Sequence, residues 1–407
     1  MSTTRPLLLL ASLVVSFLAA ASVPTPLYAV YQREWGFSPI TTTVVFGVYA
    51  VAVLSSLLVL GRVSDHVGRR PVLVAALVGE AASMVVFATA EGVAELLVAR
   101  VVQGVATGVA LATVGAGLLD LDRKRGTVAN AVAPGVGTGS GALASGLVVQ
   151  LLPAPTHLVY LAAIGVFALQ AAGVLAMRET APRRSGALAS LVPDVRLPRS
   201  VRAAAVTVAP VLLAVWALAG FYGSLGPALV RELTGSTSSV LAGLGLFVLA
   251  GVAALSVFVL RNAAPTVLMS GGVAALVVGV ALTLLAVDAR SAVGFFLATA
   301  VAGVGFGSGF QGGIRTVLPL PRPHERAGVL SVLYMVSYLG LGGPAVVAGV
   351  LVVHGGGLLA TTREYAAAVI LAALLAAVGL ARRPRPLVPV LPPAVAGSRI
   401  RQTCPGG

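Results

Sequence analysis

Residues 61–73 read GRVSDHVGRRPVL, a short charged segment between two apolar stretches of about twenty residues each. Three arginines and Asp65 lie here among glycines, and few other charges interrupt the surrounding sequence. Glycine lets a chain turn tightly and lets helices approach closely, and Asp65 supplies a counter-charge for the guanidinium groups. The segment therefore predicts a tight, charged connection between two membrane-spanning helices.

The composition of the whole chain indicates a membrane protein. Apolar residues make up 58% of the 407 residues and charged residues 10%, whereas a soluble domain carries roughly 25% charged residues. Apolar runs recur along the chain, and many reach the ~20 residues that cross a ~30 Å hydrocarbon core as a helix. We expect an all-α polytopic membrane protein with twelve transmembrane spans, near residues 7–31, 41–60, 72–90, 94–118, 127–152, 157–177, 203–229, 238–260, 264–287, 292–317, 327–352 and 365–381.

The start of the chain has features of a cleaved secretory leader, with Arg5 before an apolar run and small residues at 19–22. Because the apolar segment continues through Tyr28, we expect it to remain as the first helix. The single Cys404 and four scattered histidines supply neither a disulfide framework nor a metal cluster. We therefore expect no cofactor and no metal.

The net charge of +14 indicates an orientation in a membrane and not the binding of a nucleic acid. If the N-terminus is inside, the alternating loops place 22 of the 27 basic residues on the cytoplasmic side. This bias is the positive-inside rule, and it predicts that both termini are cytoplasmic. Basic loops that face anionic lipid headgroups need no nucleic-acid partner. One lysine against 26 arginines indicates a GC-rich coding bias, as in some bacteria.

A repeat divides the chain into two halves of six spans each. The longest polar stretch, rich in Arg, Pro and Ser, follows the sixth span. We expect an N-terminal bundle at 1–178, a cytoplasmic linker at 179–202, a C-terminal bundle at 203–382 and a cytoplasmic tail without fixed structure at 383–407. A shift of 201 residues pairs Pro26 with Pro227, Arg125 with Arg326, Gly139 with Gly340 and Gly141 with Gly342.

The charged segment resembles the signature between the second and third helices of the major facilitator superfamily, G-x-x-x-D-x-x-G-R-R/K. A second resemblance is the R-x-x-Q-G pattern of the fourth span, with an acid about twenty residues later. The resemblance implies two parallel six-helix repeats with a substrate site between them. It also implies a cytoplasmic gate that latches the outward-facing state, formed by Gly61, Asp65, Gly68, Arg69, Arg70 and Asp120.

Two charged residues of the membrane spans are candidates for proton coupling. In family terms Arg100, with Gln103, lies near the central cavity and influences proton exchange; the alternative is that Arg100 reaches the outer interface. Glu80 lies nine residues past Pro71, roughly 13 Å into a ~30 Å core. An acid at this depth usually faces a cavity and marks a proton path. The alternative is a structural acid bonded within the bundle, to Ser83 or Thr89.

Aromatic and amide side chains are candidates for the lining of a substrate cavity. An apolar, aromatic site suits amphipathic organic compounds. Each residue is also compatible with core packing or an interfacial belt. The candidates are Tyr28, Tyr31, Trp216, Phe221, Tyr222, Gln311, Tyr334 and Tyr338.

These features predict a monomeric plasma-membrane transporter that works by alternating access. The fifth span, 130–146, is similar to the glycine-rich motif of proton-coupled exporters, although Pro134 precedes Gly135 instead of following a glycine. We therefore expect efflux of a small organic molecule in exchange for protons, with the proton gradient as the energy source. The alternatives are a proton-coupled metabolite importer and a non-transporting membrane sensor. No nucleophile, metal cluster or phosphate loop suggests an enzyme.

Overall fold

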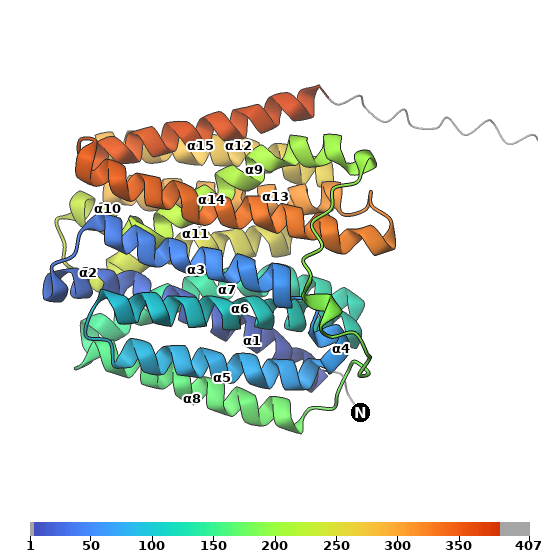
Figure 1. Cartoon of the computed structure of the whole chain (residues 1–407). Coiled ribbons are helices and arrows are strands. Elements are labelled where there is room, and N and C mark those ends of the chain that lie inside the picture. Colours follow the sequence, from blue (N-terminus) through green and yellow to red (C-terminus); the bar gives the residue numbers. More distant parts are fainter. Residues whose placement is uncertain (1–3, 383–407) are drawn as a thin grey trace, which may run out of the picture.

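The computed structural model describes residues 4–382, and all of its regular elements are helices (Figure 1). The predicted tail at 383–407 lies outside the described residues. Within them, 12 helices are long and apolar enough to cross a membrane, which confirms the predicted fold class. The elements are α1 (Thr4–Ser22), α2 (Pro24–Trp35), α3 (Pro39–Leu60), α4 (Ser64–Val67), α5 (Arg69–Ala88), α6 (Val93–Leu121), α7 (Arg123–Leu151), α8 (Pro155–Ala176), η1 (Ala189–Leu191), α9 (Arg199–Ser224), α10 (Gly226–Thr234), α11 (Ser239–Val259), α12 (Pro265–Asp288), α13 (Ala292–Val317), η2 (Pro323–Glu325), α14 (Arg326–His354) and α15 (Gly357–Ala381).

The molecule has two ends that are used as reference below. The linker between α8 and α9 crosses one end, where α1 also begins and α15 also ends (Figure 1). We call this the linker end; the charged segment 61–68 lies here too. The opposite end carries α2 and α10, and we call it the far end (Figure 1).

The first and seventh spans are interrupted, which the apolar runs did not predict. In both, the helix ends at a serine whose hydroxyl donates to a carbonyl four residues earlier: Ser22 to Leu18 at 3.0 Å and Ser224 to Gly220 at 2.7 Å. Such bonds compete with the regular helix ladder, and a proline at the start of the next helix lacks the N–H needed to continue that ladder. The short helices α2 and α10 follow these breaks.

The twelfth span begins at Gly357, earlier than the predicted residue 365. Arg363 and Glu364 masked its start because charged residues lower the hydropathy of the run. In the structure Arg363 donates to Asp288 Oδ1 from Nη2 at 2.8 Å, at the far end of α12. The charged pair therefore sits on a helix that is apolar over the rest of its length.

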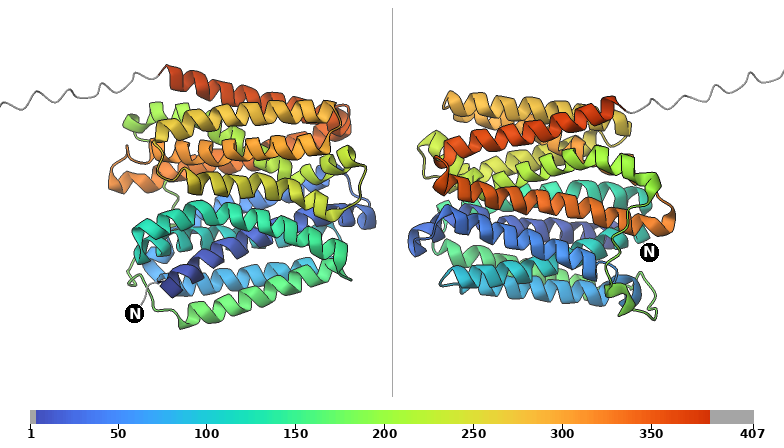
Figure 2. Two further views of the ribbon diagram at one scale, coloured as in Figure 1. Left: turned by 180° about the vertical axis from the view of Figure 1, so that it is seen from behind. Right: turned by 45° about the horizontal axis from the view of Figure 1, so that its top comes forward.

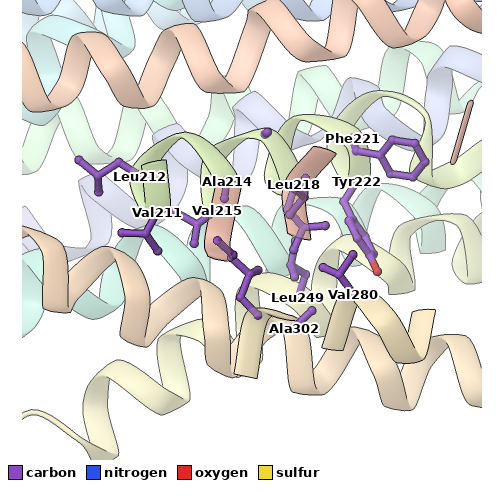
Figure 3. Close-up of a cluster of buried hydrophobic side chains, with 14 of the residues drawn as sticks. Val211, Leu212, Ala214, Val215, Leu218, Phe221, Tyr222, Leu249, Val280 and Ala302 are labelled. Atoms are coloured by element: carbon purple, nitrogen blue, oxygen red, sulfur yellow. The ribbon is translucent and has the colours of Figure 1, made fainter. Parts of the chain in front are cut away.

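Two large hydrophobic cores correspond mainly to the two halves of the chain, and a smaller cluster lies where α3 and α14 meet. One is built from α1 to α8 and includes Phe17, Phe87 and Phe167. The other is built from α9 to α15 (Figure 3), where Val215 and Leu218 of α9 pack towards Leu249 and Ala302. The views in Figures 1 and 2 show these two groups of helices as adjacent layers.

Glycine-lined seams join the halves. Helix α3 packs on α14, and α7 packs on α11. A Cβ on Gly139 would lie 3.2 Å from the Phe247 carbonyl oxygen, and a Cβ on Gly342 would lie 3.5 Å from Gly47. Backbones approach this closely only where side chains are small.

The glycine contacts of α7 and α14 show that the predicted register of the repeat is wrong in these two helices. Gly137 and Gly340 both face the first helix of their own half, at Val15 and Leu213. The equivalent pairs are therefore Gly137 with Gly340 and Gly139 with Gly342, two residues away from the predicted shift of 201. At the helix breaks the shift is 202, from Ser22 to Ser224. A single shift misses this because the loops between the helices differ in length.

Candidate transport pathway and gate

Arg100 of α6 is held in a polar cluster inside the first half. Its side chain is 0% exposed, so the alternative that it reaches the outer interface is wrong for this structure. Nη1 donates to the Ala21 carbonyl at 2.9 Å, beside the break between α1 and α2. Nη2 and Nε both donate to the Tyr28 hydroxyl, at 2.6 and 3.2 Å. A buried guanidinium needs such partners because desolvation of a charge is costly.

Aromatic rings complete the surroundings of the guanidinium. Its central carbon lies 5.2 Å from the ring centre of Tyr49 and 5.6 Å from that of Phe87. Both distances are within the range of cation–π attraction. Tyr49 also belongs to the cluster in which α3 and α14 meet between the halves. The charge of Arg100 therefore lies next to the seam between the halves.

Gln103 connects Arg100 with Glu80. Its Oε1 accepts from Arg100 Nη1 at 2.7 Å, and its Nε2 donates to Glu80 Oε1 at 3.2 Å. The other carboxyl oxygen of Glu80 accepts from the Thr107 hydroxyl at 3.3 Å. Arg100 and Glu80 are thus connected through a neutral amide, with no direct ion pair between them.

Glu80 is hydrogen-bonded within the bundle, as the structural alternative predicts, but its partners are Gln103 and Thr107 instead of Ser83 or Thr89. The Ser83 hydroxyl donates to the backbone carbonyl of Glu80 at 2.7 Å, and Thr89 bonds to the carbonyls of Val85 and Val86. The Glu80 carboxyl faces α6 instead, where it is fully buried. The polar residues of α6 recur at 100, 103 and 107, on one face of that helix, which is the pattern that could have identified them as partners.

A cavity of about 230 Å³ lies at the far end, between the two halves. Tyr28 of α2 is part of its lining, together with Thr25, Gln32 and Thr42 from the first half. Ser224, Pro227 and Arg231 line it from the second half. Tyr28 thus joins this cavity to Arg100 through its hydroxyl.

The predicted cavity aromatics fall into two groups. Trp216 and Tyr338 have ring centres 4.9 Å apart and lie in the cluster between α3 and α14. Tyr334 packs against the same cluster. The indole Nε1 of Trp216 is buried without a hydrogen-bond partner among the described residues. These side chains therefore lie at the seam between the halves.

The remaining candidates lie inside one half. The hydroxyls of Tyr31 and Tyr160 are 3.0 Å apart in the first core, and Tyr222 is 2.7 Å from Thr299 in the second. Phe221 packs on Tyr365, with ring centres 5.0 Å apart. Gln311, with its amide oxygen turned towards α13's last turn, accepts from Arg315 Nε at 3.0 Å. Sequence alone gave no direction for these side chains, so pathway and core residues looked alike.

At the linker end, Arg69 is surrounded by the predicted charged residues. Its Nη1 bonds to Asp65 Oδ1 at 2.5 Å and to Ser64 Oγ at 2.7 Å. Its Nε lies 3.3 Å from Asp120 Oδ2, at the end of α6. Arg69 is 7% exposed, so these ion pairs are less screened than surface pairs. The arrangement ties the loop 61–68 to the fourth span.

Glu179, which sequence reasoning did not single out, caps α5. Its carboxylate accepts from the backbone N–H of Arg69 at 2.8 Å and of Arg70 at 3.0 Å. Burial opposes ionisation, but backbone N–H groups of Ala181, Arg69 and others outweigh it and hold the Glu179 pKa below its usual value. The signal in the sequence was an acid directly after the sixth span, at the start of the linker.

Gly68 and Gly61 of the charged segment are required for different structural reasons. Gly68 has φ of +103°, a conformation that favours glycine, and a Cβ there would lie 2.7 Å from Glu179 Oε2. Gly61 lies directly after α3, and a Cβ there would overlap the Leu57 carbonyl. Arg70 follows Arg69 at the start of α5 and contributes its N–H to Glu179.

Among the described residues, no group of three or more His, Cys, Asp or Glu side chains could hold a metal ion.

Comparisons with known proteins agree with this architecture. No curated protein matches the chain in sequence. A crystal structure of the nucleoside transporter NupG (a point mutant) is similar in fold, with a TM-score of 0.71 at 13% identity, over 92% of this chain and 99% of that one. A crystal structure of the human organic anion transporter MFSD10 (TETRAN) has a TM-score of 0.62 at 19% identity, over 92% and 100%. The sequence model of the Major Facilitator Superfamily matches residues 8–344, so this multi-pass membrane protein belongs to that superfamily.

Proposed function

We propose that the protein is a secondary active transporter that exports a small organic molecule in exchange for protons. The observation that carries the proposal is the buried chain from Tyr28 through Arg100 and Gln103 to Glu80. It connects a carboxyl group in the hydrocarbon layer with a cavity between the halves. Fold neighbours described as transporters of nucleosides and of organic anions support a small organic substrate.

In an alternating-access cycle, the seams between the halves and the linker end have different roles. The halves rock about the seams between α3 and α14 and between α7 and α11. Trp216, Tyr334 and Tyr338 contact the substrate at these seams, while the Arg69 cluster holds the linker end closed. Glu80 gains and loses a proton as the rocking changes its access to water. The glycine-rich α7 favours export over import.

The test uses purified protein in proteoliposomes that contain a pH-sensitive dye. Gradients of nucleosides, aromatic carboxylates and lipophilic amines are imposed one at a time. We expect at least one class to drive proton movement in the wild type. Glu80→Gln keeps the shape and hydrogen bonding of the side chain but cannot release a proton, so proton movement stops while exchange of labelled substrate continues.

The matched control is Glu95→Gln, which removes an exposed acid from α6, the helix that carries Arg100. It should leave proton movement unchanged. Normal uphill transport and normal pH dependence in Glu80→Gln would show that Glu80 is a structural acid. Coupling would then have to be sought at Asp65 or Asp120.

We also propose that the protein is a monomer in the plasma membrane, with the linker end in the cytoplasm. The excess of basic residues in the loops of that end supports this orientation. A reporter fused after Arg183 should report the cytoplasm, and one fused near Arg290 should report the outside. The reverse pattern would contradict the assignment.

A further inference from the structure

The far-end cavity is lined by several side chains that carry hydrogen-bond donors. It lies between α2 and α3 of the first half and α9, α10, α14 and α15 of the second. Three of its lining residues carry donor protons for which the described residues supply no acceptor: Tyr28, Thr42 and Arg231.

The Thr42 and Tyr28 hydroxyls are used as acceptors by their neighbours. Thr42 Oγ1 accepts from Gln32 Nε2 at 2.9 Å, and the Tyr28 oxygen accepts twice from Arg100. Each hydroxyl can still donate its own proton. Both residues are buried, at 4% and 3% exposed. A buried donor usually has a partner, and a ligand in the cavity would supply it.

Arg231 of α10 adds a positive charge to the same cavity. Its side chain is half-buried, and no carboxylate of the described residues lies within ion-pair distance of it. The acid next to it in sequence does not neutralise it, because Glu232 is exposed and forms no described ion pair. Burial, and then the like charge of Arg33, lower the pKa of the Arg231 guanidinium.

Arg33 of α2 provides an internal comparison. It stands near the end of α2 as Arg231 does near the end of α10. Arg33 is exposed and donates from Nε to the Ala29 carbonyl at 3.2 Å, which is the ordinary use of a basic residue in a last helical turn. Arg231 makes no such bond among the described residues and lines the cavity instead. The two arginines therefore have different roles.

We propose that the far-end cavity is a binding site for a small organic anion, with Arg231 as the residue that pairs with its carboxylate. This inference rests on the proposed transport function and adds the class of substrate to it. A guanidinium matches a carboxylate in charge and can bind it with two parallel hydrogen bonds. Thr42 donates a further hydrogen bond, and the ring of Tyr28 with Leu225 and Pro227 contacts the apolar body.

The site selects by charge in either direction of transport. An exporter releases its substrate through this end, and an importer captures it there. Because Tyr28 also holds Arg100, an anion bound in the cavity lies on the same path as the Glu80 chain. The site thus discriminates substrates before or after they pass the region that we assign to proton coupling.

The test measures thermal unfolding of the full-length protein in detergent, at fixed pH and ionic strength. The probe is benzoate, with benzamide as its neutral isostere and benzamidine as its cationic one. A ligand that binds the folded state raises the unfolding temperature in a saturable manner. We expect benzoate to do so and the other two compounds to have no such effect.

Variants assign the effect to the cavity. Arg231→Gln should raise the apparent Kd for benzoate at least ~tenfold, because a charge-assisted hydrogen bond is lost. Arg231→Lys, which keeps the charge, should retain part of the affinity. Arg33→Gln removes the exposed arginine and should change the Kd by about twofold or less.

Three results would overturn the proposal. The first is equal stabilisation by benzoate and benzamide, and the second is an unchanged benzoate affinity in Arg231→Gln. The third is the absence of any benzoate effect in the wild type. The readout does not depend on a proton gradient. Loss of coupled transport without loss of benzoate binding would thus refute the proposed function alone.

Discussion

The two halves follow one helical plan but bury different chemistry. In the first half the space between α5 and α6 holds Arg100, Gln103 and Glu80. In the second half the corresponding helices α12 and α13 meet through glycines: a Cβ on Gly305 would overlap Leu276, and one on Gly279 would overlap Ala302. Corresponding elements are α1 and α9, α2 and α10, α3 and α11, α5 and α12, α6 and α13, α7 and α14, and α8 and α15.

This difference shows that the same pair of helices can pack either through glycines or around a buried charged network. Close glycine contacts make α12 and α13 a tightly packed apolar unit. Buried charges between α5 and α6 are costly and are stabilised only by a complete set of hydrogen bonds. The first half therefore buries a charged network between its helices, whereas α12 and α13 of the second half pack through glycines.

The largest effect is expected for Arg100→Met. The substitution removes the hydrogen bonds to Ala21, Tyr28 and Gln103 and leaves the Glu80 carboxyl without its nearby cation. Loss of one partner from a buried charged network costs about 3–5 kcal/mol. Thermal unfolding in detergent should show a clearly lowered midpoint, together with loss of transport. A midpoint like that of the wild type would show that the network contributes nothing to folding.

An intermediate effect is expected at the linker end. Asp65→Asn removes an ion pair of Arg69 that is worth about 1 kcal/mol, so the balance between the two conformations should shift roughly fivefold and turnover should fall accordingly. The variant should still bind substrate, with an apparent affinity changed by no more than the same factor, because Asp65 lies outside the proposed site. Transport rates and binding affinities measured on the same preparation check this.

The control for Asp65→Asn comes from the loop of the second half. There Arg261 lies over the ring of Phe258, at 4.6 Å, and has no described ion pair. Arg261→Gln should leave turnover unchanged. If both variants slowed transport equally, the two loops would have the same role. The proposed difference between the halves at the linker end would then be wrong.

An effect similar in size to that of Asp65→Asn is expected for Tyr222→Phe in the second core. The change removes one hydrogen bond, between the Tyr222 hydroxyl and Thr299 Oγ1, and should destabilise the protein by about 1 kcal/mol. Thermal unfolding again measures it. A loss as large as that of Arg100→Met would mean that both halves depend equally on buried polar groups.

The smallest effect depends on pH. The Glu179 pKa is lower in the folded protein than in an unfolded chain. Its stabilising contribution is thus present above the unfolded value of about 4.3 and is lost as the pH falls through the folded value. Glu179 is exposed, so solvent screens its interaction with the helix, and Glu179→Gln should be less stable than the wild type at neutral pH by about 0.5 kcal/mol or less. The difference should shrink in acid; a constant difference would exclude this mechanism.

The fold was predictable because hydropathy is a property of each segment by itself. The range 292–317 coincides with α13, and the charged segment 61–73 does connect α3 with α5. The break after Ser22 was not predictable from hydropathy, because serine within an apolar run does not lower it enough. Most residues of the predicted gate stand within one loop, where their spacing marks them. Glu179 is distant in sequence and becomes a cap only when α8 packs beside α5.

The direction of side chains was the main gap in the predicted site. Tyr28 and Tyr31 are three residues apart on α2, yet Tyr28 lines the cavity and Tyr31 bonds to Tyr160 in the core. Which face of a helix meets the other half depends on tertiary packing, and nothing in a uniformly apolar helix marks that face. The same reason explains why Trp216 and Tyr222 have different surroundings.

The repeat register has a consequence for engineering the chain. The spacing from the helix break to the next span is shorter in the second half, since α10 has 9 residues and α2 has 12. Later in the chain the corresponding spacings are longer in the second half. The glycines of α7 and α14 nevertheless contact equivalent helices. Changes of chain length have thus been absorbed at the ends of helices, where loop closure costs little. Tags and inserted peptides are best tolerated at these connections, for example at 235–238, and least within the glycine seams.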